Sequence, residues 1–142
     1  MSVYIAVELQ RKIRKKFADC CAYCRSAEFL TVTIFEFEHI IPLSAGGETV
    51  LNNLCLSCPS CNRYKASRQK LLDEDTQQEV SLFHPQKQLW SEHFTWNEDA
   101  TEILPLSSVG RVTISALKMN RPQLVRVRKM WVKLDEHPPD IL

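Results

Sequence analysis

The sequence predicts an α+β protein whose N-terminal half is held together by a bound metal ion. Residues 31–41 are rich in β-branched and aromatic types, which is typical of a strand, and residues 59–72 favour a helix. Two Cys-x-x-Cys pairs bracket the strand and the histidine in it, and the second pair lies at the start of the predicted helix. The second half of the chain mixes short strand-like stretches with helix-like ones, so both kinds of element are expected there too.

The first predicted element is an amphipathic helix that ends near Asp19. Leu9, Ile13 and Phe17 recur every four residues, and basic side chains fill most positions between them. The basic face suits contact with phosphates or simple solubility, and these two interpretations are compatible. The side chains on it that we assign to nucleic-acid binding are Lys12, Lys15 and Lys16.

The strand at 31–41 is expected to end at Pro42, because proline cannot donate a hydrogen bond to a neighbouring strand. A Gly-Gly pair then marks a turn, and a second short strand is expected at 54–56. A helix follows from Pro59 or the next residue to about Leu72, since proline suits the first helical turn. The predicted local order is strand, loop, strand, helix.

The C-terminal half is predicted to be a separate extension. Residues 73–79 are acidic and lack periodicity, so a linker or loop is expected there. Short strands are expected around 93–97 and 101–105. We therefore divide the chain into a core at 1–72 and an extension at 73–142.

Two helices are expected to close the extension. Ser108 is placed to cap a helix over 109–119, with Asn120 at its C-terminal end. Pro122 is placed to start a second helix that ends near Leu134. Together they would form a helical hairpin with a basic second arm. The extension could complete the core, grip DNA or form a dimer face, and these alternatives stay open.

Charge is unevenly distributed, although the formal net charge of the chain is only +1. Residues 1–72 carry a net +4, residues 73–105 a net −7 and residues 106–142 a net +4. Basic regions of this kind suit nucleic acid, and they are equally typical of solvated surfaces.

The opening residues lack the pattern of a secretory signal, and no apolar run reaches the ~18 residues of a membrane span. We therefore expect a cytoplasmic protein without a membrane partner.

The cysteines predict a structural zinc site. In a reducing compartment, paired Cys-x-x-Cys motifs are typical of metal ligands rather than of disulfides. Two such turns complete a tetrahedral site for Zn²⁺. The four predicted ligands are Cys21, Cys24, Cys58 and Cys61. Cys20 and Cys55 are left as buried or incidental thiols. An iron–sulfur run that starts at Cys55 is the alternative, and it lacks a fourth cysteine at a matching spacing.

A candidate reactive set lies between and just after the cysteines. The imidazole of His39 can accept a proton from water near neutral pH. Its neighbour Glu38 and the amide of Asn62 offer oxygen ligands for a hard divalent cation. Such a set fits metal-assisted hydrolysis of a phosphodiester. Strict strand alternation sends Glu38 and His39 to opposite faces, so the strand must twist or end there, or the longer Glu must reach around. Glu36 is a competing ligand, which we expect to be a solvated carboxylate.

Several separately spaced motifs occur in one order: Cys-x-x-Cys, Glu-His-Ile-Ile-Pro at 38–42, Gly-Gly, Asn-Leu, and Cys-x-x-Cys-Asn-x-x-Lys at 58–65. In this order and spacing they resemble an HNH endonuclease of the ββα-metal (His-Me finger) fold with a structural zinc. The resemblance covers residues 8–70 or so. Residues 82–139 also look like the C-terminal extension of a set of bacterial, notably cyanobacterial, HNH proteins, and this second resemblance implies no chemistry.

The resemblance implies a role for each matching residue. His39 is the general base that activates water. Asn53, also in the catalytic set, pins the loop and thereby orients His39. Glu38 and Asn62 bind the catalytic Mg²⁺ or Mn²⁺. Glu38 stands where Asp is commoner and Asn62 where the family name expects His, which bears on metal preference. The remaining histidines, expected to be structural or at the surface, are His84, His93 and His137.

The predicted function is divalent-metal-dependent hydrolysis of DNA, with double-stranded DNA as the expected partner. The side chains after the last cysteine that we assign to nucleic-acid binding are Arg63, Lys65 and Arg68. The alternative is a zinc-stabilised nucleic-acid-binding module without catalysis. Sequence specificity, oligomeric state and biological role stay open, because no base-reading element stands out.

Overall fold

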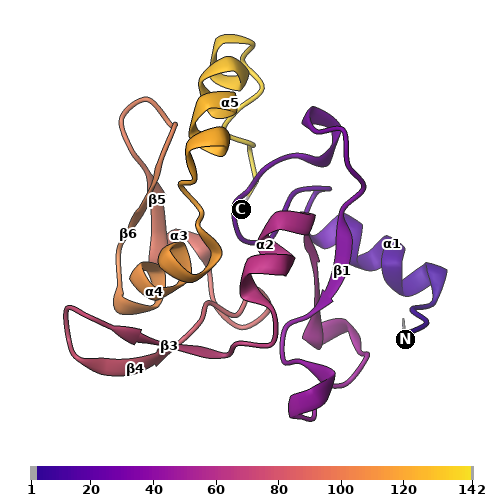
Figure 1. Ribbon diagram of the computed structural model, residues 1–142. Coiled ribbons are helices and arrows are strands. Elements are labelled where there is room, and N and C mark those ends of the chain that lie inside the picture. Colours follow the sequence, from indigo (N-terminus) through magenta and orange to yellow (C-terminus); the bar gives the residue numbers. More distant parts are fainter. Residues whose placement is uncertain (1–2, 142) are drawn as a thin grey trace.

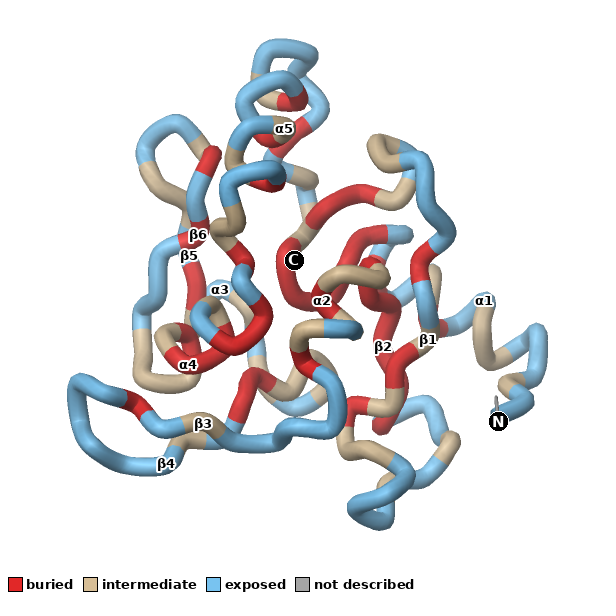
Figure 2. The backbone as a smooth tube through the Cα atoms, viewed as in Figure 1, coloured by how far each residue is buried: buried red, intermediate tan, exposed pale blue. Residues whose placement is uncertain are grey.

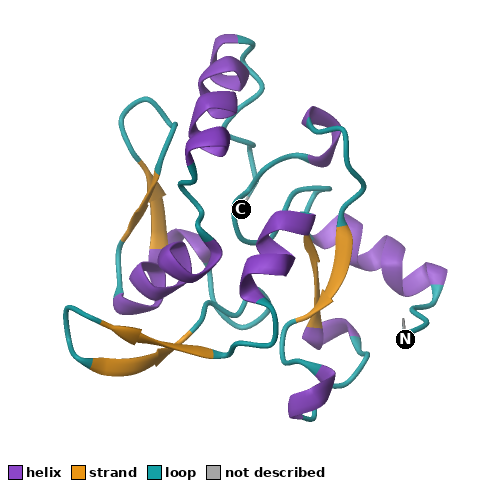
Figure 3. Ribbon diagram, in the orientation of Figure 1, coloured by secondary structure: helices purple, strands orange, loops and turns teal. Residues whose placement is uncertain are grey.

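The structure is a computed structural model that describes residues 3–141. Over these residues it contains three antiparallel hairpins with helices packed between and around them (Figures 1 and 3). In chain order the elements are α1 (Val7–Lys16), β1 (Glu36–His39), β2 (Leu54–Ser57), α2 (Pro59–Lys65), β3 (Lys70–Asp73), β4 (Gln78–Ser81), α3 (Trp90–His93), β5 (Phe94–Trp96), β6 (Ile103–Pro105), α4 (Ser108–Leu117) and α5 (Pro122–Lys133). The α+β class is confirmed.

The first hairpin, β1–β2, lies between two helices. Its antiparallel register pairs Glu38 with Cys55. On one face, the guanidinium of Arg14 in α1 lies over the ring of Phe37, 5.4 Å from its centroid. On the other face, Lys65 of α2 contacts the Glu38 carboxylate. Because successive strand residues point to opposite faces, the hairpin separates α1 from α2. The predicted order of strand, loop, strand and helix is confirmed.

The first predicted strand is much shorter in the structure. Only residues 36–39 pair with β2, whereas residues 31–35 have no partner strand. Val32 and Ile34 are exposed instead, and the Thr31 hydroxyl donates to Glu28 O. A β-branched composition favours extended backbone, but a strand also needs a partner strand for its backbone hydrogen bonds. The four residues of β2 pair with residues 36–39 and leave no partner for residues 31–35.

The helix predicted at 59–72 is also too long. It ends at Lys65, and Ala66 has a left-handed backbone with φ 52°. Residues 70–73 then form β3, so the segment 73–79, expected to be a linker, contains the end of β3, the turn of the β3–β4 hairpin and the start of β4. The buried carboxylate of Asp73 pairs with Arg111 of α4, with 2.9 Å between Oδ2 and Nη2. The predicted boundary between residues 72 and 73 therefore falls inside a strand.

The strands and helices of the extension lie close to their predicted positions. The N-cap of α4 is Ser107, whose Oγ accepts from Gly110 N at 3.1 Å. Asn120 does not cap this helix, because its amide pairs with the backbone of Ile103 through two contacts of 2.8 Å. Figure 1 shows α5 directed away from α4, so the two helices follow one another without packing as a hairpin along their lengths.

One hydrophobic core joins both halves of the chain. Ile13 and Leu56 of the first half belong to the same buried cluster as Phe83, Phe94 and Leu117 of the second. Figure 2 shows buried backbone running through β2 and along one side of α4. The extension therefore completes the core, which was one of the three alternatives. Among residues 3–141, no helix is long and apolar enough to cross a bilayer.

Candidate active site and metal centre

The four predicted zinc ligands converge. The sulfur atoms of Cys21, Cys24, Cys58 and Cys61 all lie within 4.8 Å of one another, and all four residues are buried. Cys58 is the N-cap of α2, and its Sγ accepts a hydrogen bond from Cys61 N at 3.3 Å. The two Cys-x-x-Cys turns are thus brought together by the start of α2 and by β2.

This donor set fits zinc. Four thiolates at about 2.3 Å from a tetrahedral Zn²⁺ would lie about 3.8 Å from one another. The Cys24 and Cys58 sulfurs are separated by 3.8 Å. The set is the one group of three or more potential metal-ligating Cys, His, Asp or Glu side chains found among residues 3–141. The cluster is therefore compatible with a structural zinc ion, as predicted.

The other two cysteines lie outside the cluster. Burial raises the pKa of the Cys20 thiol to about 11, so this thiol stays protonated at neutral pH. The Cys55 thiol lies on β2 beside Glu38, with 3.4 Å between Sγ and Oε2. Burial raises its pKa as well. Neither thiol has the low pKa of a reactive cysteine, and the iron–sulfur alternative is not supported.

The four-cysteine cluster also receives a contact from the C-terminal extension. Arg121, at the start of α5, places Nη2 4.0 Å from Cys58 Sγ. A zinc ion with four thiolates carries a net charge of −2, so a guanidinium at this position is electrostatically favourable. The sequence offers no signal for this contact, because Arg121 is 60 residues beyond the last cysteine.

His39 is the last residue of β1. Its Nε2 lies 2.9 Å from Thr49 Oγ1, a partner for which the sequence gives no signal. Burial lowers the pKa of the imidazole, and the nearby Glu38 carboxylate opposes this shift. A neutral imidazole retains one nitrogen lone pair, which is what a general base requires. The loop that follows β1 carries Thr49, so the conformation of this loop controls the orientation of the ring.

Asn53 holds that loop closed. Its buried side chain accepts a hydrogen bond from Ile41 N at 2.8 Å and donates to Ile41 O at 3.1 Å and to Glu48 O at 2.9 Å. A Cβ atom at Gly47 would lie 1.9 Å from Ile41 O, so only glycine fits where the loop passes the strand end. The effect of Asn53 on catalysis stays a prediction, whereas its contacts to the loop are direct.

Asn53→Ala is expected to lower the free energy of unfolding by about 2–4 kcal/mol, because the half-buried Ile41 N would lose its side-chain acceptor and the buried Asn53 site its other two contacts. Urea unfolding of the zinc-loaded protein measures this loss. The neighbouring Asn52 is exposed, so Asn52→Ala is the matched control and should change stability by less than about 0.5 kcal/mol. Equal effects of the two substitutions would contradict the proposed role of Asn53.

Glu38 points away from His39. Its carboxylate is buried on the α2 side of the hairpin, where Lys65 Nζ lies 2.8 Å from Oε1. The same ammonium group donates to Ile40 O at 2.9 Å. The contact with Oε1 is an ion pair without good hydrogen-bond angles, and that oxygen has no other partner. Strand alternation therefore holds, and the longer Glu side chain does not reach around the strand.

The predicted ligands of the catalytic ion do not converge. Asn62 lies one helical turn before Lys65, and its Nδ2 donates to Glu36 Oε1 at 2.6 Å. Glu36 and Glu38, on one face of β1, thus contact two different residues of α2. The described arrangement does not fit an ion held by Glu38 and Asn62 together. Glu36 is exposed, as expected of a solvated carboxylate, and it is also the carboxylate that lies beside Asn62.

The prediction that Lys65 contacts phosphate is contradicted. Its side chain is 2% exposed and its ammonium group is occupied by Glu38 and Ile40 O. Arg68 is exposed, but its Nη2 donates to Ala116 O in α4 at 2.8 Å, so it links α2 to the extension. The remaining predicted contacts are exposed and stay predictions: Lys12, Lys15, Lys16 and Arg63.

Lys65→Ala is expected to lower the free energy of unfolding by about 3–5 kcal/mol, because it leaves the Glu38 carboxylate buried without a counter-charge. The double variant Glu38→Gln, Lys65→Met removes both charges and should recover most of the loss. Thermal unfolding of the three proteins measures the effect. A Lys65→Ala protein that keeps its stability but loses DNA affinity would restore the phosphate-contact interpretation.

The comparisons with known proteins agree with the metal centre and the core. The family model described as HNH endonuclease matches residues 21–68, which is less than half of the chain. A search of curated proteins and a search of solved structures each gave no match. The matched segment runs from the first zinc ligand through β1, β2 and α2. Residues 21–68 are therefore similar to the HNH endonuclease family, and the name HNH domain refers to this segment.

Proposed function

We propose that the protein is an endonuclease that hydrolyses phosphodiester bonds in DNA, with His39 as the general base. The observation that supports this most directly is the imidazole itself, which lies at a strand end with one nitrogen placed 2.9 Å from Thr49 Oγ1. Its lowered pKa keeps most of the ring neutral at physiological pH. The HNH domain supplies the general class of activity.

In the proposed reaction, Nε2–H donates to Thr49, which leaves Nδ1 with its lone pair. Nδ1 takes a proton from water as the water oxygen attacks phosphorus. A new P–O bond forms and the bond to one sugar oxygen breaks. That oxygen takes a proton from solvent water on leaving, and the protonated imidazole later returns its proton to solvent. General-base assistance of this kind contributes roughly 10²–10⁴-fold to a rate. The Asn53 contacts hold the loop that carries Thr49, so they orient the base.

A requirement for Mg²⁺ or Mn²⁺ belongs to the proposal on the strength of the domain family alone. Glu38 and Asn62 do not supply a shared ligand set in the described arrangement, because each contacts a different partner. This disagreement favours the alternative function, a zinc-stabilised nucleic-acid-binding module without catalysis. The proposed compartment is the cytoplasm, where thiols remain reduced and available to zinc.

Incubation of the zinc-loaded protein with supercoiled plasmid separates the two functions. We expect nicked circles with Mg²⁺ or Mn²⁺ and none in excess EDTA at short times. Zinc content is measured before and after, so that loss of the structural ion is not mistaken for loss of catalysis. Binding without nicking under every divalent ion would favour the non-catalytic module, and nicking in metal-free buffer would contradict the ion requirement.

A further inference from the structure

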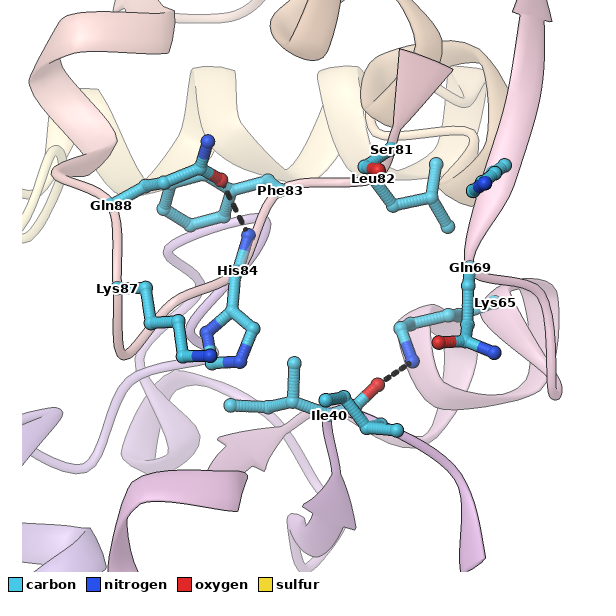
Figure 4. A pocket seen from close by; sticks show the side chains of 11 residues that line it. Ile40, Lys65, Gln69, Ser81, Leu82, Phe83, His84, Lys87 and Gln88 are labelled. Carbon is cyan, nitrogen blue, oxygen red and sulfur yellow. Dashed lines mark hydrogen bonds between the residues drawn. The ribbon is translucent and has the colours of Figure 1, made fainter. Parts of the chain in front are cut away.

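A cleft lies between the HNH domain and the C-terminal extension. Its volume is about 320 Å³. Its walls come from residues 40–41 just after β1, from the end of α2 and the segment that follows it, and from residues 81–88 of the extension. Figure 4 shows His84 and Lys87 on one side of the opening and Lys65 and Gln69 on the other. A second cavity of about 170 Å³ adjoins it and shares Ile41, His84 and Lys87.

The cleft is positively charged. Lys70 and Lys87 line it, both are exposed, and neither is within 4 Å of a carboxylate among residues 3–141. No acidic side chain lines the cleft, and Glu48 lines the adjoining cavity. The pKa of His84 is lowered by burial and then by the charges of Lys87 and Lys65. The charge of Lys65 is compensated by Glu38, so the uncompensated cations are the two exposed lysines.

The segment that presents His84 and Lys87 is held on several sides. Gln86 donates from Nε2 to Leu51 O at 2.9 Å and to Leu54 O at 2.8 Å, which ties the turn to the HNH domain. Lys16 of α1 contacts the Gln86 amide oxygen. His84 N donates to Gln88 Oε1 at 2.8 Å (Figure 4). A turn fixed in this way presents its side chains at low entropic cost, as a binding site requires.

The ring of His84 has one nitrogen engaged within its own turn. Its Nδ1 accepts a hydrogen bond from Gln86 N at 3.2 Å. In the neutral imidazole the proton is then on Nε2, which is a donor without a described partner. A hydrogen-bond donor beside an unpaired ammonium group is a typical arrangement for a phosphate oxygen. The sequence alone predicts a structural or surface role for His84, because its neighbours in the chain are not ligand-like.

We infer that the cleft binds the sugar–phosphate backbone of DNA, with His84, Lys87 and Lys70 on phosphate groups. This inference rests on the proposed action on DNA. The adjoining cavity reaches Gly46, Gly47 and Glu48, next to Thr49, the partner of His39. A strand held in the cleft can therefore continue toward the proposed general base. The extension then contributes part of the substrate site, although it lies outside residues 21–68.

The test measures DNA binding in the absence of cleavage. All proteins carry His39→Ala and zinc, and the probes are a short fluorescent duplex and its single strand in buffer without added divalent ions. The cleft variant is Lys70→Ala, Lys87→Ala. The matched control is Lys129→Ala, Lys133→Ala, which removes two exposed lysines from α5 and changes net charge equally. Thermal unfolding checks that every variant is folded.

We expect the Kd of the cleft variant to rise about tenfold and the slope of log K against log salt to fall by about 2 in magnitude, since each lost phosphate contact contributes roughly 0.9. The control should shift Kd by less than about twofold. Equal weakening by the control variant overturns the inference, and so does a parent protein that binds neither probe. If the parent binds through the cleft but wild type never nicks plasmid, the cleft stands and the proposed catalysis fails.

Discussion

Replacement of His39 by alanine is expected to reduce DNA nicking by about 10²–10⁴-fold, the usual contribution of a general base. Binding should change little, because the lowered pKa leaves most of the ring neutral at physiological pH. Single-turnover nicking with saturating protein measures the chemical step separately from binding. His84→Ala is the informative comparison. It removes a second half-buried histidine, and it should weaken binding while leaving most of the single-turnover rate at saturation.

The partner of His39 gives a graded control. Thr49→Val removes the hydroxyl that lies 2.9 Å from Nε2 and keeps the shape of the side chain. We expect a smaller loss of rate than for His39→Ala, since the base remains but its orientation is no longer held. A His39→Ala protein that nicks at the wild-type rate would remove His39 from the mechanism.

The pH dependence of nicking follows from the same imidazole. Burial lowers the pKa of His39 below its ordinary value of 6.5, and the opposing influence of Glu38 is smaller. The active form is neutral, so the rate should fall as pH drops through this lowered pKa and stay level above 6.5. The unfolded chain accepts the proton first, so folding stability should also fall as pH decreases below 6.5. A rate that increases toward acid pH would contradict the assignment.

Loss of one zinc ligand is expected to unfold the HNH domain. Cys58→Ser removes a thiolate that also caps α2 through Cys61 N. Structural zinc sites contribute about 10–16 kcal/mol of apparent folding free energy in peptides, which is comparable to the ~5–15 kcal/mol that stabilises a typical domain. The variant should therefore lose its zinc and its cooperative thermal transition. Zinc content and circular dichroism of the purified protein measure both effects.

Cys55→Ser is the matched control for the zinc variant. Cys55 is equally buried and lies on the adjoining strand, but its sulfur is outside the cluster. Serine is slightly smaller and can donate to the Glu38 carboxylate as the thiol does. We expect full zinc content and a stability loss of about 1 kcal/mol or less. If Cys58→Ser kept its zinc and its transition while Cys55→Ser lost both, the ligand assignment would be wrong.

Arg121 tests whether the extension supports the metal centre. Its guanidinium lies 4.0 Å from Cys58 Sγ. Replacement by methionine keeps much of the side-chain volume and removes the charge, so we expect faster zinc release to a chelator, by about 10-fold or more. Arg126 is exposed on the same helix, and Arg126→Met should leave zinc release unchanged. Equal release rates for both variants would show that the charge of Arg121 does not help to hold zinc.

The sequence predicted the metal centre and the order of elements around it because both follow from local chain properties. The spacing of Cys21 and Cys24, and of Cys58 and Cys61, permits two tight turns that share one ion, and the structure brings all four sulfurs together. Pro59 and Pro122 each start a helix, since their fixed backbone suits a first turn. Strand alternation alone correctly separated Glu38 from His39.

Tertiary structure decided which groups those side chains meet. Glu38 contacts Lys65 rather than an ion ligand set because α2 packs on that face of β1, and the packing of a helix on a hairpin is not a local property. Residues 70–72 were predicted to continue α2, but they pair with β4 as part of a strand, which is also a contact between separate segments. The cleft likewise depends on tertiary structure, because its walls come from segments that are far apart in the sequence. The residues of the metal centre and the candidate base could be read from the sequence, whereas their partners and the path to them depended on contacts between distant segments.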